Sequence, residues 1–192
     1  MKKLIIGMNM LIIFFGCQNS TDVDNKNSAI TTAFDEQEEL AEIMKVIEEE
    51  TMCFFERNYD CWSKHWIHEN YAFQAWNNDD GTFDAAIGWE NIDNQGKDYI
   101  KNVPEGKTTT SHPFVIRENL QVKFYNDNLA YLIWKQYNAD RERKYFNISQ
   151  ETRLMEKKAG DWKIVNVSAF WNAKTSIPID SINIVPANNV TY

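Results

Sequence analysis

The chain has 192 residues, of which 43% are hydrophobic and 25% are charged, a composition that is typical of one globular domain and excludes a disordered chain. The formal net charge of -8 and the pI of about 4.9 would repel a phosphate backbone, so we expect no nucleic-acid partner. With only 3 Cys, the chain is not a disulfide-built mini-scaffold. Its 7 Trp supply large apolar surfaces for a core and for the lining of a cavity.

Residues 1–16 have the organisation of a bacterial export signal. Basic residues precede an apolar run over residues 4–15, which is shorter than the ~20 apolar residues that span a bilayer. Gly16 then precedes Cys17, a step that resembles the lipobox of bacterial lipoproteins, although the two residues before Gly16 are Phe. We therefore predict a signal peptide over 1–16, lipidation of Cys17 and a lipid-anchored location in the cell envelope, at the periplasmic face or the cell surface. An ordinary secretory signal is the alternative.

Residues 17–34 are polar and predict a flexible tether, because they contain almost nothing that a core could bury. Export would place the remaining cysteines, Cys53 and Cys61, in an oxidising compartment where a disulfide can persist. Their spacing does not show whether their Cα atoms come close enough for a bond. A disulfide and a pair of buried free thiols therefore both remain open.

Helical patterns dominate the first half of the domain. Asp35 followed by Glu38 has a capping-box pattern, and apolar residues then recur at helical spacing as far as Phe55. Within this helix, the acidic run 48–50 predicts a solvated face. A short helix is expected over 61–67, with Trp62, His65 and Trp66 on one side. A third helix is expected from Trp89 to a point before Pro104, preceded by a strand over 71–76 and a turn over 77–81.

Strand patterns fill the second half. Residues 114–118, 120–125 and 129–137 are rich in β-branched and aromatic side chains, and the polar residues 126–128 predict a hairpin turn. A second hairpin is expected from 145–158 and 162–171, around residues 159–161. Residues 172–192 predict a C-terminal tail or an edge strand. Helices followed by antiparallel strands indicate an α+β domain.

Four segments together resemble the nuclear-transport-factor-2-like superfamily, which includes the SnoaL-like domains and the ketosteroid isomerases. The segments are the turn between the first two helices at 58–62, the glycine-led helix start at 88–92, the central hairpin turn at 126–130 and the final hairpin at 151–165. The resemblance implies a domain over 35–171, built as a cone in which three N-terminal helices wrap a curved antiparallel sheet around a pocket. It implies pocket residues among Trp62, Trp66, Trp76, Tyr99, Trp134, Glu151, Asn166, Ser168 and Phe170.

The resemblance disfavours ketosteroid-isomerase chemistry. The position of the catalytic base falls on Ala75 or Trp76, and neither side chain accepts a proton. Glu151 is the counterpart of the second acid, and Arg153 shares its strand face by alternation. The remaining acid or base candidates are His65, Tyr71 and His112.

We expect no metal and no cofactor. His65 and His68 are three residues apart, but the pattern does not supply the converging ligands that zinc needs.

The leading hypothesis is an envelope lipoprotein that binds a small, largely apolar ligand in the pocket of the cone. A SnoaL-like isomerase, cyclase or hydrolase with an unusual acid/base set is the first alternative. A protein-interaction or homodimerisation module is the second, since members of the superfamily often pair through the outer face of the sheet.

Overall fold

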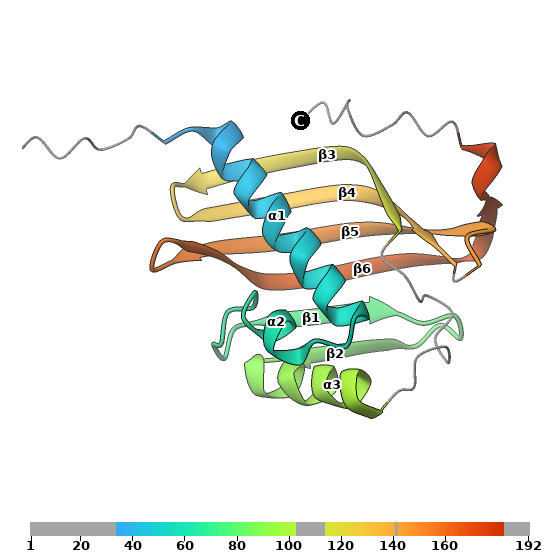
Figure 1. The fold of residues 1–192 in the computed structure, drawn as a ribbon, viewed down its shortest axis with the longest axis horizontal. Helices are drawn as coiled ribbons and strands as arrows, with labels where there is room; N and C mark the ends of the chain where they lie inside the picture. The colour runs from blue at the N-terminus through green and yellow to red at the C-terminus, as the bar shows by residue number, and fades with distance from the viewer. Residues whose placement is uncertain (1–33, 103–113, 141, 183–192) are drawn as a thin grey trace, which may run out of the picture. The chain divides into compact units, whose positions relative to one another are not determined.

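The computed structural model describes residues 34–102, 114–140 and 142–182. They form three helices, one six-stranded sheet and a short 3-10 turn (Figure 1). The helices are α1 (Glu36–Phe55), α2 (Tyr59–Ser63) and α3 (Trp89–Asn102); the strands are β1 (Phe73–Asn77), β2 (Phe83–Ile87), β3 (Val115–Asn126), β4 (Leu129–Ala139), β5 (Tyr145–Lys158) and β6 (Asp161–Pro178). The expected signal peptide, the tether as far as residue 33 and the candidate His112 lie outside the described residues.

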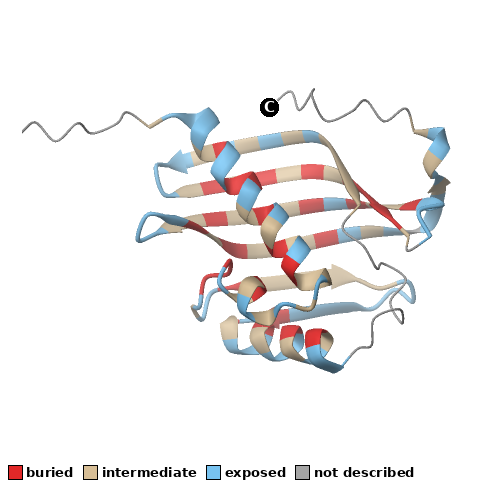
Figure 2. Ribbon diagram, in the orientation of Figure 1, coloured by how far each residue is buried: buried red, intermediate tan, exposed pale blue. Residues whose placement is uncertain are grey.

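Helix α1 begins where the sequence predicts. The Asp35 carboxylate accepts hydrogen bonds from the backbone N–H groups of Gln37 and Glu38, and so satisfies donors that the first turn leaves free. Leu40, Ile43 and Ile47 are buried along one side of the helix, facing the sheet (Figure 2). The hydrophobic effect along this stripe therefore fixes α1 on one face of the sheet.

Helix α2 ends at Ser63, four residues before the end at residue 67 that the sequence predicts. The reason is a backbone exchange with β6: the Ile164 N–H donates to the His65 carbonyl, and the Ile67 N–H donates to the Ile164 carbonyl. These bonds hold residues 65–67 beside β6, and Trp66 forms a parallel bridge with Ile164. Trp62, His65 and Trp66 are nevertheless all buried, as expected of residues on one side.

The strand order is β2-β1-β6-β5-β4-β3. All neighbours pair antiparallel except β1 and β6, which are parallel, so the expectation of an antiparallel sheet holds for every other pair. Strand β2 was not predicted from the sequence, in which the third helix is expected directly after the turn at 77–81. Strand β6, which lies between β1 and β5, continues to Pro178, where it pairs with Tyr145. Residues 172–178 are therefore part of this strand rather than a tail or an edge strand that begins after Trp171.

The main core lies between the helices and the sheet and includes the fully buried Trp62. Helix α3 approaches this indole so closely that a Cβ at Gly96 would lie 2.2 Å from the Trp62 ring. Only glycine fits there, because real side-chain contacts are never that short. A smaller second cluster around Phe146 and Tyr137 fills the far end of the sheet.

Among the described residues, no helix is long and apolar enough to cross a membrane.

Candidate functional site

The face of the sheet that α1 covers, here called the inner face, carries a row of buried polar side chains. Directly opposed residues of antiparallel strands share a face, and Trp134 lies opposite Glu151 while Gln136 lies opposite Ser149. The alternation of β4 and β5 therefore brings their polar positions together. This set, called the polar row below, consists of Gln136, Asn138, Ser149, Glu151 and Arg153, each less than a tenth exposed.

The polar row is one continuous hydrogen-bonded chain. The Gln136 amide donates to Asn138 at 2.7 Å, and the Asn138 amide donates to Ser149 Oγ at 3.1 Å. Ser149 in turn donates to Glu151 Oε1 at 2.6 Å, and Arg153 donates to Glu151 Oε2 at 2.9 Å. At the other end of the polar row, Gln136 accepts a hydrogen bond of 3.0 Å from the indole N–H of Trp134, which is not itself a member of the row. Buried polar groups are costly unless they are paired, so this chain removes most of the cost.

Two arginines flank Trp134 beneath α1. The guanidinium carbon of Arg153 lies 5.1 Å from the Trp134 ring centroid, and that of Arg117, on β3, lies 5.8 Å from it. Their side chains are only 8% and 13% exposed. Within the described part of the chain, the Nε of each arginine is buried without a hydrogen-bond partner. Burial lowers the pKa of Arg117, and the Glu48 carboxylate, 3.6 Å away, opposes that shift.

Glu50 reaches the same region from α1. Its Oε1 accepts hydrogen bonds from the indole N–H groups of Trp62 at 2.9 Å and Trp66 at 3.2 Å. Burial raises the pKa of the Glu50 carboxyl, while the positive charges of Arg153 and Arg117 and the two indole donors act against the rise. The expectation of a solvated face over 48–50 is therefore wrong at its last residue, since Glu50 is 9% exposed.

Trp134 and Glu151, two of the expected pocket residues, lie in this region of the inner face. Trp62 and Trp66 contact it through Glu50, as members of the core. Trp76, on β1, is half-buried and lies opposite Ala169.

Tyr99 lies elsewhere: it stacks on Phe54 at 4.5 Å, in the layer between α1 and α3.

Asn166, Ser168 and Phe170 do not face the pocket side as the resemblance implies. The partners of Ser168 and Phe170 on β5 are Thr152 and Gln150, whereas Glu151 and Arg153 pair with Ala169 and Val167. The cause is a β-bulge: Leu154 pairs with Asn166 but Met155 pairs with Ile164, so Val165 is an extra residue. The bulge reverses the alternation, and these three residues lie on the opposite face, here called the outer face.

The acid and base candidates separate in the structure. Glu151 lies in the polar row, but Tyr71 is 50% exposed and donates a hydrogen bond to Glu156 at the surface. His65 is buried beside Glu49, with its Nε2 3.6 Å from the carboxylate, and burial lowers its pKa. His68 is exposed and stacks on Trp89.

A surface depression of about 360 Å³ near His68 is lined by His68, Glu69, Asn70, Ile87, Gly88, Trp89, Glu90 and Asn91, none of which is an expected pocket residue.

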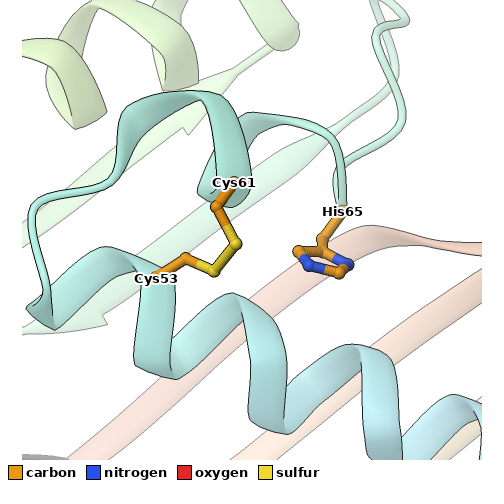
Figure 3. A group of neighbouring side chains, drawn as sticks. All are labelled: Cys53, Cys61 and His65. Atoms are coloured by element: carbon orange, nitrogen blue, oxygen red, sulfur yellow. A yellow bond between two sulfur atoms is a disulfide. The ribbon is translucent and has the colours of Figure 1, made fainter.

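A disulfide joins Cys53 on α1 to Cys61 on α2, with the Cα atoms 5.5 Å apart. Of the two alternatives left open by the sequence, the structure has the bonded pair. The His65 ring lies beside this disulfide (Figure 3).

Sequence reasoning missed Glu50, Arg117, Gln136, Asn138 and Ser149. A signal for the last three was present, because period-two alternation from Trp134 and from Glu151 reaches each of them.

No protein-family model and no curated protein matches the chain. Among solved structures, 245 chains match it. One is an NTF2-like protein of unknown function from Shewanella oneidensis MR-1, with a TM-score of 0.52 and 13% identity over 69% of this chain and 98% of that chain. The fold is NTF2-like. This confirms the resemblance inferred from the four sequence segments, together with the expected α+β class of a curved sheet wrapped by three helices.

Two further structural neighbours are an enzyme and a protein of unknown function. The hexachlorocyclohexane dehydrochlorinase LinA-type3 from Novosphingobium barchaimii LL02 has a TM-score of 0.52 and 17% identity over 78% of this chain and 96% of that chain. A cystatin-like fold protein of unknown function from Nostoc punctiforme PCC 73102 also has a TM-score of 0.52, with 14% identity over 72% of this chain and 94% of that chain. Enzymes and proteins of unknown function thus share this fold.

Proposed function

We propose that the domain binds a small, largely apolar ligand that carries a carboxylate, on the inner face of the sheet beneath α1. The observation that supports this is the pair of buried arginines. Arg117 and Arg153 each hold an Nε–H that no acceptor satisfies among the described residues. A buried, unpaired donor on a charged group costs about 1–3 kcal/mol or more, and a ligand carboxylate would supply the missing acceptor.

The surroundings suit such a ligand. A guanidinium group presents its donors in a planar fork that matches a carboxylate, and both forks flank the apolar face of Trp134. Trp76 and Trp171 lie on the same face, opposite Ala169 and Ser149, and both are half-buried. These indoles offer an apolar surface next to the charged end of the site.

The geometry favours binding over proton transfer. Glu151, the expected acid that lies on the inner face, already forms an ion pair with Arg153 and accepts a hydrogen bond from Ser149. These contacts hold it as an acceptor in the polar row. Tyr71, which is exposed, and His65, which faces the disulfide, do not join Glu151 there.

The test is a comparison of carboxylates with their neutral amides. Phenylacetate, cinnamate and octanoate would be titrated into the protein, with the corresponding amides as controls, and binding followed by calorimetry and by the rise in Tm. Ligands that bind only the folded state raise Tm. We expect at least one carboxylate to bind and its amide to bind more than about 10-fold more weakly, since charge-assisted hydrogen bonds are roughly twice as strong as neutral ones.

Two variants distinguish the site from non-specific attraction. Arg117→Gln should abolish the carboxylate response, because it removes one guanidinium group beneath α1. Lys123→Gln removes one positive charge from an exposed position on the same strand and should leave binding unchanged. Equal binding by Arg117→Gln and the unchanged protein, or equal binding of amides and carboxylates, would overturn the proposal.

We further propose that the outer face pairs with a second copy of the chain. Phe83, Ile87 and Phe170 are 75%, 66% and 60% exposed. They surround Ala75, Ala85 and Ser168, small side chains that share this face by register. Exposed apolar patches of this kind mark interaction sites. Sedimentation velocity should show a dimer that the double variant Phe83→Ser/Phe170→Ser makes monomeric, whereas Tyr125→Ser, an exposed aromatic at the other edge of the sheet, should not. A monomer at all concentrations would rule the dimer out.

We also propose that Cys17 anchors the domain to the bacterial envelope. The support is the sequence of residues 1–17, and a disulfide between Cys53 and Cys61 is compatible with an oxidising compartment. Intact-mass measurement of the protein from the bacterial membrane fraction should show the mass of a lipid that Cys17→Ser lacks. Equal masses, apart from the substituted atom, would remove the anchor.

A further inference from the structure

Three metal-ligating side chains meet where the end of α1 packs on α2. Cys53 comes from α1, Cys61 from α2 and His65 from the segment that follows α2 (Figure 3). The two sulfur atoms and a ring nitrogen of His65 all lie within 4.8 Å of one another. The sequence gives little sign of this group, because the three residues have neither a CxxC pattern nor any other familiar zinc spacing.

The His65 ring is built into this position rather than free at the surface. Its side chain is 7% exposed, and its Nε2 is buried with no hydrogen-bond partner in the described parts of the chain. A buried imidazole nitrogen without a partner is unusual, because such groups normally have one. The Glu49 carboxylate Oε2 lies 3.6 Å from the Nε2, and the positive charges of Lys64 and Lys163 also act on the ring.

We propose that opening the Cys53–Cys61 disulfide creates a zinc site, in which the two thiolates and His65 bind Zn²⁺. Glu49 lies outside this group of three but 3.6 Å from His65 Nε2, and its side chain would turn in to supply the fourth ligand. Thiolate, imidazole and carboxylate are the ligands that Zn²⁺ takes in tetrahedral sites. Two such ligands at zinc-bond length lie about 3.4 Å apart around a tetrahedral centre, close to the 3.6 Å between His65 Nε2 and Glu49 Oε2. The disulfide and the metal site are therefore alternative cross-links between the same two helices.

The redox step balances with a dithiol as the reductant. The dithiol gives two electrons and two protons, its own sulfurs join in a disulfide, and the S–S bond between Cys53 and Cys61 breaks to give two thiols. Zinc binding then displaces the two thiol protons to solvent, since the ligand is the thiolate. The metal would hold α1 against α2 after the covalent link is gone.

Cobalt is the probe that reports these ligands directly. The experiment uses the full chain carrying Cys17→Ser, without a histidine tag, so that Cys53 and Cys61 are the remaining cysteines. The protein is reduced with a phosphine, which forms the phosphine oxide with oxygen from water and adds no thiol of its own, and is then titrated with Co²⁺ under anaerobic conditions. We expect the sulfur-to-cobalt charge-transfer band and the strong visible bands of a tetrahedral thiolate site, which added Zn²⁺ should abolish.

Matched variants assign the ligands. His65→Ala should weaken the affinity for Co²⁺ more than about 10-fold, and Glu49→Gln should weaken it less. His68→Ala, which removes an exposed histidine outside the group, should change nothing. The oxidised protein should show no cobalt bands, because its sulfurs are bonded to each other.

The proposal is overturned if the reduced protein stays folded, by circular dichroism, and yields no thiolate-cobalt band. It is also overturned if His65→Ala and His68→Ala bind Co²⁺ equally well. Neither outcome bears on the carboxylate site, which is measured on the oxidised protein and lies at Arg117 and Arg153.

Discussion

Each face of the sheet carries one region in which the usual distribution of side chains is reversed. On the inner face, beneath α1, Glu151 and Arg153 are only 2% and 6% exposed, whereas Phe83 and Phe170 on the outer face are 75% and 60% exposed. Charged residues are almost never buried in this way unless they are paired, and large exposed apolar groups become noteworthy when they cluster. A chain selected for stability alone would not place its side chains like this. The inner face is therefore the better candidate for a ligand site, and the outer face for a partner.

The largest expected effect comes from breaking the ion pair of the inner face. Arg153→Ala leaves the Glu151 carboxylate buried without its positive partner, and the loss of one member of a buried pair typically costs about 3–5 kcal/mol. Urea denaturation of the two proteins at pH 7 measures the difference. The double variant Glu151→Gln/Arg153→Met removes both charges and should recover much of the loss, because the uncompensated charge is gone. A loss below about 1 kcal/mol for Arg153→Ala would mean that water already reaches Glu151, as at a surface pair.

The contrast between the faces also shows where sequence reasoning stops. The cap at Asp35 and the final hairpin follow from local patterns, because a cap and a tight turn each involve residues close in the chain. The face of the sheet on which Phe170 lies does not follow from a local pattern. It depends on the single extra residue Val165, and the sequence carries no mark of that bulge. One residue is enough to move every later side chain to the other face.

Strand β2 and the burial of Glu50 were also not predicted from the sequence, for a similar reason. Strand β2 has a partly alternating sequence, but three of its five positions expose apolar or small side chains, and only pairing with β1 makes it a strand. Glu50 belongs to an acidic run that looks solvated. Its burial depends on indole donors from α2 and the following segment, and on the charge of Arg153 more than a hundred residues later. Contacts between distant residues decide these positions, so local composition cannot.

The second-largest expected effect is a change in the free energy of unfolding with pH, which should have opposite signs for two glutamates of α1, Glu50 and Glu39. Burial raises the pKa of Glu50, so its folded form holds the proton more tightly than its unfolded form. The stability from this group is complete below about pH 4.5, the unfolded value, and is lost as the pH rises through the folded value. Glu50→Gln cannot ionise. The free energy of unfolding of Glu50→Gln, relative to that of the unchanged protein, should therefore increase as the pH rises from 4 to 7, which means that the variant gains in relative stability.

Glu39 is the matched control, because its pKa is shifted in the opposite direction to that of Glu50. Burial acts to raise its pKa, but hydrogen bonds from Lys157 and Trp162 lower it below the usual range. Its stabilising contribution is present above about pH 4.5 and is lost as the pH falls through the folded value. Glu39→Gln should therefore be destabilising at pH 7 and nearly neutral at pH 3. Denaturation curves at several pH values that showed the same trend for both variants would contradict the assignment of Glu50 as a buried acid.

The smallest expected effect is the change in the free energy of unfolding when an exposed apolar residue of the outer face is replaced. Phe170→Ser replaces a side chain that is 60% exposed, and exposed substitutions usually change the free energy of unfolding by less than about 0.5 kcal/mol. Phe146, on the adjacent strand β5, is fully buried in the second cluster, and Phe146→Ala should cost about 3–5 kcal/mol. The measurement must be made at low protein concentration, because a dimer adds stability that depends on concentration. If Phe170→Ser destabilises even the dilute protein as much as Phe146→Ala does, then Phe170 is packed within one chain and the outer face is not an open partner surface.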